Sequence, residues 1–154
     1  MSNSIALILH LIAINIWIGG SFFATIILGR AIKHIETHQQ LIVWELVLSR
    51  FFRWAWIAVF ILLGSGGWMF YHLYARGLFA PLHVKLMGII ALIMVALFFF
   101  IYFVPFRQFK RVLQEEDVEA CLRELSVIHV ASTVNLVLGF CVVFVIAGGP
   151  YFLY

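Results

Sequence analysis

Four long apolar stretches dominate the sequence and limit what the chain can fold into. They cover residues 4–29, 54–75, 82–104 and 125–147, and the only Lys, Arg, Asp or Glu within them is Lys85. A helix of about 20 residues is long enough to cross the hydrocarbon core of a bilayer. The sequence therefore predicts a single membrane domain over residues 1–154, built as an all-α, up-and-down bundle of four transmembrane helices.

The composition supports a membrane environment. Hydrophobic residues make up 65% of the chain and charged residues 11%, whereas soluble domains carry roughly 45–50% and about 25%. These values exclude a soluble enzyme, and an aromatic content of 17% excludes a disordered chain. The formal net charge is +3, but the cations do not form a stripe, so we expect membrane lipid rather than nucleic acid as a partner.

The positive charges predict an orientation in the membrane. Two connections, residues 30–53 and 105–124, hold most of the cations, whereas the connection at residues 76–81 carries only Arg76. By the positive-inside rule the two basic connections face the cytoplasm and both termini face outward. We therefore expect an integral protein of a bacterial inner membrane. The cations of the two basic connections are Arg30, Lys33, Arg50, Arg53, Arg107, Lys110, Arg111 and Arg123.

Other residues outside the spans give no sign of a soluble site. The acidic run at residues 115–119 is expected to extend a helix and to present a solvated face. Cys121 lies in a charged segment and Cys141 in an apolar one. Neither their spacing nor their surroundings suggests a disulfide or a zinc site.

Three histidines are predicted to converge in the outer half of the bundle. His10 lies six residues into the first span, His72 near the outward end of the second, and His83 at the outward start of the third. A histidine inside a membrane is costly unless it has a partner. The alternative to a shared site is that each bonds a neighbouring helix or reaches the membrane surface. His129 lies near the cytoplasmic end without a histidine partner, so we expect one redox centre rather than two.

Two ligands suit these histidines. A b-type haem needs two neutral imidazoles from facing helices, an apolar slot, and cations for its propionates. Copper(I) instead prefers thioether and imidazole ligands, and Met69 lies three residues from His72, as Met87 lies four from His83. The alternative role of these methionines is to fill the core.

The remaining outer residues favour haem over copper. Arg76 and Lys85 are the cations of that side, and they would stabilise propionates but repel a metal ion. Trp17 lies two turns from His10 on a stripe that continues with small residues, which leaves room for a flat ligand. Two of the three outer histidines would supply the axial ligands, and the residue spacing leaves open which two.

Two short motifs resemble a known superfamily. The first span reads HLIAINIWIGG from His10, and the third opens PLHVKL, with Arg50 ahead of the second span. These resemble four-span membrane proteins of the copper-resistance CopD type and of the HemJ type, protoporphyrinogen oxidases that bind b-type haem. The resemblance implies that His10, His83 and Lys85 match positions around the HemJ-type active region, and that Arg50 matches a basic residue before the second span. It therefore favours His10 with His83 as the axial pair, with His72 as the replacement ligand.

The chain also departs from the HemJ-type pattern. Residues 23–26 read FATI where those oxidases have a Tyr-Leu-x-Arg-like stretch, and residues 127–130 read VIHV where they have an Asn-Glu-x-Pro-like stretch. The Trp-x-Gly-Gly turn of the first span fits the CopD type equally well.

These observations predict a membrane protein that binds haem b and takes part in electron transfer or porphyrinogen oxidation, as a haem-dependent oxidoreductase. Its expected partners are a quinone or porphyrinogen, a membrane redox protein, or a second copy of the chain. The first alternative is copper transport across the membrane, and the second is a structural or assembly subunit. The predicted cofactor-binding residues are His10, Trp17, His72, Arg76, His83 and Lys85, with Met69 and Met87 added for copper.

Overall fold

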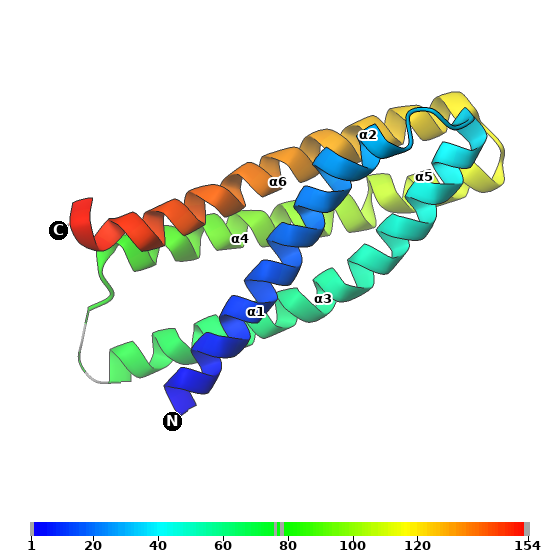
Figure 1. Cartoon of the computed structure of the whole chain (residues 1–154). Coiled ribbons are helices and arrows are strands. Elements are labelled where there is room, and N and C mark those ends of the chain that lie inside the picture. Colours follow the sequence, from blue (N-terminus) through cyan, green and yellow to red (C-terminus); the bar gives the residue numbers. More distant parts are fainter. Residues whose placement is uncertain (1, 76, 78, 153–154) are drawn as a thin grey trace.

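The computed structural model is a bundle of long helices (Figure 1) and describes residues 2–75, 77 and 79–152. Four helical stretches are long and apolar enough to cross a membrane. This finding confirms the predicted all-α, four-helix architecture. The elements are α1 (Ser2–Phe22), η1 (Phe23–Leu28), α2 (Gly29–Ala31), α3 (Thr37–Ala75), α4 (Leu82–Phe103), α5 (Pro105–Gln114) and α6 (Val118–Phe152).

The two ends of the bundle differ in chemistry. The turns at residues 32–36 and 115–117 lie together at one end, which we call the basic end because the cations of the two basic connections surround it. The opposite end holds both termini of the chain (Figure 1) and the starts of α1 and α4. We call it the histidine end, since the spans carry His10, His72 and His83 in that half.

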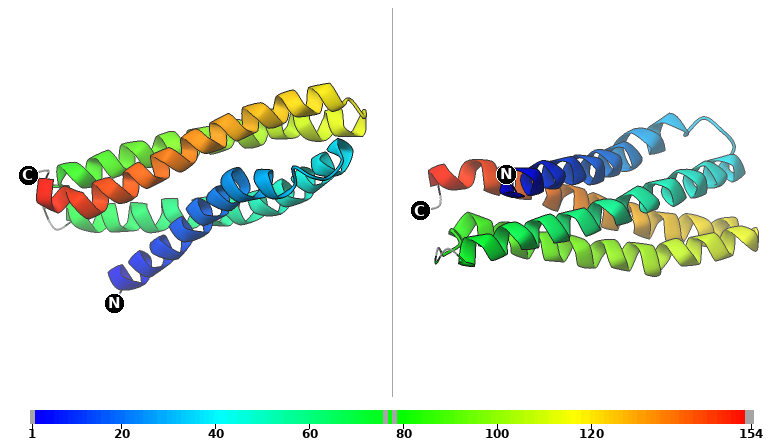
Figure 2. Two further views of the ribbon diagram at one scale, coloured as in Figure 1. Left: turned by 45° about the horizontal axis from the view of Figure 1, so that its top comes forward. Right: turned by 90° about the horizontal axis from the view of Figure 1, so that it is seen from below.

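The helices pack as two pairs that aromatic rings join. α1 packs along α3, and α4 and α5 pack along α6 (Figure 2). Between the pairs, the ring of Trp56 on α3 stacks on Phe99 and meets Phe98 edge-on, both at 5.3 Å between centroids. Phe52 on α3 lies 4.6 Å from Phe106 on α5. Such offset and edge-to-face contacts add to the stabilisation from buried area. We call these rings the aromatic layer, and they determine the spacing of the two helix pairs; they belong to Phe52, Trp56, Phe98, Phe99 and Phe106.

The helices at the basic end are longer than the predicted spans. α3 has 39 residues, which is about 58 Å of helix against roughly 30 Å of hydrocarbon. Residues 37–53, which we expected to form a connection, are therefore helical. Their buried side chains, Leu41, Trp44 and Leu48, recur at helical spacing and belong to the same core as Phe109 of α5.

The helix α5 is fixed at its start and along its length. Pro105 is its first residue, a position where the missing N–H costs nothing, and it separates α5 from α4. Lys110 Nζ lies 3.5 Å from Glu45 Oε1 on α3. Ser49 Oγ donates to the same carboxylate oxygen at 2.7 Å. The ion pair joins α5 to α3 beyond the expected membrane boundary, and Ser49 holds the Glu45 carboxylate from within α3.

The acidic run does not form the helical extension that we expected. Glu116 has a φ of +57°, and the N–H of Asp117 donates to the Val112 carbonyl at 3.2 Å, as in a Schellman motif that ends a helix. Asp117 Oδ1 then accepts the N–H of Ala120 at 3.0 Å and caps the start of α6. The expected helical conformation is wrong for residues 115–117, because capping interactions end α5 and begin α6 there. Glu119 does lie within α6, and residues 115–119 are exposed, as expected.

Candidate functional site

His10 is held between α1 and α3 by a short chain of hydrogen bonds. Its Nδ1 lies 2.9 Å from Ser65 Oγ. The Ser65 hydroxyl donates its proton to the Ile61 carbonyl at 2.5 Å, so the serine oxygen accepts from the imidazole. His10 Nδ1 therefore carries the proton, and Nε2 carries the lone pair. The ring also lies against Gly66, where an added Cβ would lie 3.4 Å from His10 Cε1.

His72 lies on α3, seven residues from Ser65 and thus two turns closer to the histidine end. Its ring meets Trp68 edge-on at 4.6 Å between centroids. His72 Nε2 is buried and has no hydrogen-bond partner, and the same is true of Asn3 Oδ1 on α1. Because α1 and α3 are antiparallel and His10 meets Ser65, Asn3 falls at the level of His72.

His83 lies against α6 rather than against another histidine. A Cβ added at Gly149 would lie 2.7 Å from His83 Cγ, so the imidazole stem packs directly on the glycine backbone. His83 Nδ1 is buried without a partner. Lys85, two residues later, is exposed, and Arg76 lies outside the described residues.

The register of the aromatic layer gives the relative depths of the histidines. Trp56 meets Phe99 and Phe52 meets Tyr102 across α3 and α4, and continuing this antiparallel register brings His83 to the level of His72. His10, next to Ser65, lies about 10 Å deeper, because two helical turns separate Ser65 from His72. Among the described residues, no group of three or more His, Cys, Asp and Glu could hold a metal ion.

The other predicted residues take part in packing. Trp17 is only 4% exposed, and its ring meets Phe98 edge-on at 5.8 Å between centroids. It therefore joins α1 to the aromatic layer instead of lining an open slot. Met87 packs on the edge of the core, and Met69 is half-buried.

Packing at the histidine end is sparse. The large buried side chains of the spans stop at the level of Val59 and Met94. Beyond that level, the buried residues that the structure describes are Ala6, Ala13, Ser65, Ala80, Val142 and Gly149. A groove of about 460 Å³ lies between α1 and α3, next to Ser65 and Trp68. None of the three histidines lines this groove: His83 packs on Gly149, and His72 lies against the rings of Trp68 and Tyr71.

A second group of polar residues lies nearer the basic end, where α1 meets α6. His129, Ser132 and Thr25 line one small cavity, and Asn135 is buried one turn further along α6. The sequence analysis singled out only His129. The spacing of residues 129, 132 and 135, which places three polar side chains near one face of a helix, is the signal that could have found this group.

The chain matches no protein-family model, no curated protein and no solved structure.

Proposed function

We propose that this chain is an integral membrane protein that binds a b-type haem at the histidine end and passes single electrons between a lipid-soluble donor and a membrane partner. The observation that carries the proposal is the pair of buried imidazole nitrogens, His72 Nε2 and His83 Nδ1, that have no partner. Such atoms are costly in an apolar environment. A ligand that occupies the sparse packing around them would remove that cost.

The donor set fits a haem better than a free metal ion. Imidazoles from two facing helices are the ligands of bundle-held b-type haems, which exchange one electron at a time. His72 and His83 belong to opposite helix pairs and lie at similar depth, and this supports them as the axial pair. Lys85 supplies a cation near His83 for a propionate. The pairing of His10 with His83, expected from the sequence, stays a prediction that the same experiment tests.

His10 has a different role in this proposal. Its Nδ1 is held by Ser65, so its Nε2 lone pair has a fixed direction, as in ligands that a second hydrogen bond orients. It lies deeper than the other two histidines, where it can accept a proton from the hydroxyl of a quinol or the N–H of a porphyrinogen. The superfamily resemblance supports the same classes of donor.

The visible absorption spectrum of the purified protein tests this function. We expect Soret and α bands that sharpen on reduction, and we expect His72→Ala and His83→Ala each to lose most of the bound haem. His34→Ala is the matched control, because His34 lies in an exposed turn, and it should keep the full spectrum. His10→Ala should keep the haem and slow its reduction by a quinol.

Two outcomes would overturn parts of this proposal. Full haem in His72→Ala, with loss in both His10→Ala and His83→Ala, would restore the His10 and His83 pairing. A colourless protein that retains copper in metal analysis, and loses it in Met69→Leu and Met87→Leu, would establish the copper alternative. The absence of both ligands would leave only a structural or assembly role.

A further inference from the structure

An irregular segment, η1, directly follows α1 and faces α6. Over η1 the α-helical hydrogen bonds are replaced by wider π-type ones, and Thr25 Oγ1 donates to the Ser21 carbonyl at 2.7 Å. Short π segments inside α-helices occur often at functional sites. Here the segment lies opposite His129 and Ser132 of α6, and these two side chains line one cavity together with Thr25 of η1.

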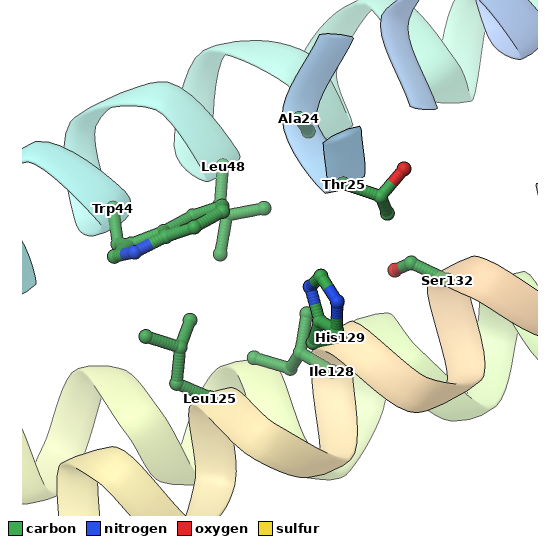
Figure 3. A pocket seen from close by; sticks show the side chains of 8 residues that line it. All are labelled: Ala24, Thr25, Trp44, Leu48, Leu125, Ile128, His129 and Ser132. Carbon is green, nitrogen blue, oxygen red and sulfur yellow. The ribbon is translucent and has the colours of Figure 1, made fainter. Parts of the chain in front are cut away.

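The cavity is the size of a water molecule. Its volume is about 10 Å³, close to the smallest space that holds one water. Figure 3 shows the His129 imidazole standing between α6 and the residues of η1 and α3, with the Ser132 hydroxyl turned toward it. A ring nitrogen and a hydroxyl are two hydrogen-bonding partners, which is enough to hold a water.

Asn135 places an unsatisfied polar group deeper in the membrane. Its side chain is 5% exposed, and its Oδ1 has no hydrogen-bond partner. Across the α1/α6 contact, Thr25 lies opposite Ser132 and Ile18 lies against Gly139. Asn135 is between these levels, so it faces α1 near Ser21. It lies about 15 Å from the start of the predicted span at residue 125, near the middle of a bilayer.

We propose that water enters the membrane along this contact, from the basic end past His129 and Ser132 to Asn135. We call this path the hydrated seam. Water in the cavity bonds His129 and Ser132, and a further water donates to Asn135 Oδ1, which removes an otherwise costly unpaired amide oxygen. The seam gives the interior of the bundle a polar connection to one side of the membrane. It does not depend on haem, and the imidazole of His129 lies at its mouth.

Cysteine accessibility tests the seam without reference to activity. A thiol reacts with a charged methanethiosulfonate only as thiolate, and so only where water reaches it. The background is Cys141→Ala, because Cys141 is exposed on the lipid-facing surface and Cys121 is buried. In membrane vesicles we expect Ser132→Cys and Asn135→Cys to react at least about tenfold faster than the lipid-facing control Val134→Cys.

The control is matched in depth. Val134 is next to Asn135 in the chain and is 46% exposed on the outside of the bundle, so the two positions differ only in the face they occupy. The faster reaction should occur when reagent is supplied from the basic end. His129→Leu, which replaces the polar group at the mouth, should slow labelling of Asn135→Cys several-fold.

The opposite results would overturn the seam. Equal rates at positions 132, 134 and 135, or faster labelling from the histidine end, contradict a water path from the basic end. Size-exclusion profiles of each variant in detergent separate loss of folding from loss of water. Because none of these readouts involves a cofactor, the seam and the proposed function can fail independently.

Discussion

A single glycine on α6 decides how closely α4 approaches α6 at the histidine end. Gly149 is buried, and the stem of His83 occupies the place where a Cβ would be. Histidine positions in the sequence predicted the end of the bundle at which these residues meet, because each span has a fixed direction. They did not predict that His10 bonds Ser65 or that His83 packs on a glycine. Those contacts depend on how each helix is rotated about its axis, and a span that is apolar on all sides gives no sign of that rotation.

We therefore expect Gly149→Ala to destabilise the bundle by about 1–3 kcal/mol, as is typical of overpacking in a full site. The added methyl group must displace His83 or separate α4 from α6. Thermal unfolding in a fixed detergent measures the change. Gly88→Ala is the control, because nothing lies within 4 Å of a Cβ at Gly88. An unchanged midpoint in Gly149→Ala would contradict the close contact.

Among the helices, the sequence predicted the four membrane spans but missed the helical segments that extend beyond them. Apolar length predicts a transmembrane helix reliably because lipid offers backbone groups no partners. The helical part of α3 before residue 54 was missed because its charges at Arg50 and Arg53 suggested a connection. The π segment η1 could not be predicted, since its residues are as apolar as those around it and its wider hydrogen-bonding pattern leaves no mark on the composition.

The α3 and α5 contact beyond the expected membrane boundary should be stabilised by apolar burial. Phe109 is fully buried there. Phe109→Ala should lower the free energy of unfolding by about 3–5 kcal/mol. The matched control Leu46→Ala, whose side chain is 49% exposed, should change it by less than about 0.5 kcal/mol. Denaturant titration in detergent compares them, and equal effects would contradict a water-excluding core in this region.

The two ends of the whole molecule differ in charge, and the sequence alone predicts this difference. Both termini lie at the histidine end (Figure 1), so they lie on the same side of any membrane that the four helices cross. The aromatic layer lies toward the basic end, and the histidines lie where packing is sparse. The sequence predicted the depth of these groups along the helix axes, because depth follows from residue number. It did not predict which neighbouring helix each side chain faces, because the rotation of a helix about its axis does not follow from residue number.

Reporter fusions test the orientation. Alkaline phosphatase fused after Tyr154 should be active, because the positive-inside rule places the C-terminus outside the cytoplasm. A fluorescent protein inserted after Gln114, in the basic connection, should fluoresce in the cytoplasm. Inactive phosphatase at the C-terminus together with a dark insertion would reverse the orientation and place the histidines on the cytoplasmic side.

The length of α3 gives the molecule a lever. Residues 37–53 form a continuous arm of about 25 Å beyond the predicted span, and the arm is one helix with the part that carries Ser65 and His72. A tilt of about 10° within the membrane moves the far end of a 25 Å arm by roughly 4 Å, which exceeds the shifts of about 1–2 Å that helices make at allosteric interfaces. Small changes of helix angle around the histidines would therefore cause larger displacements at the basic end, where the arm packs in the same core as α5.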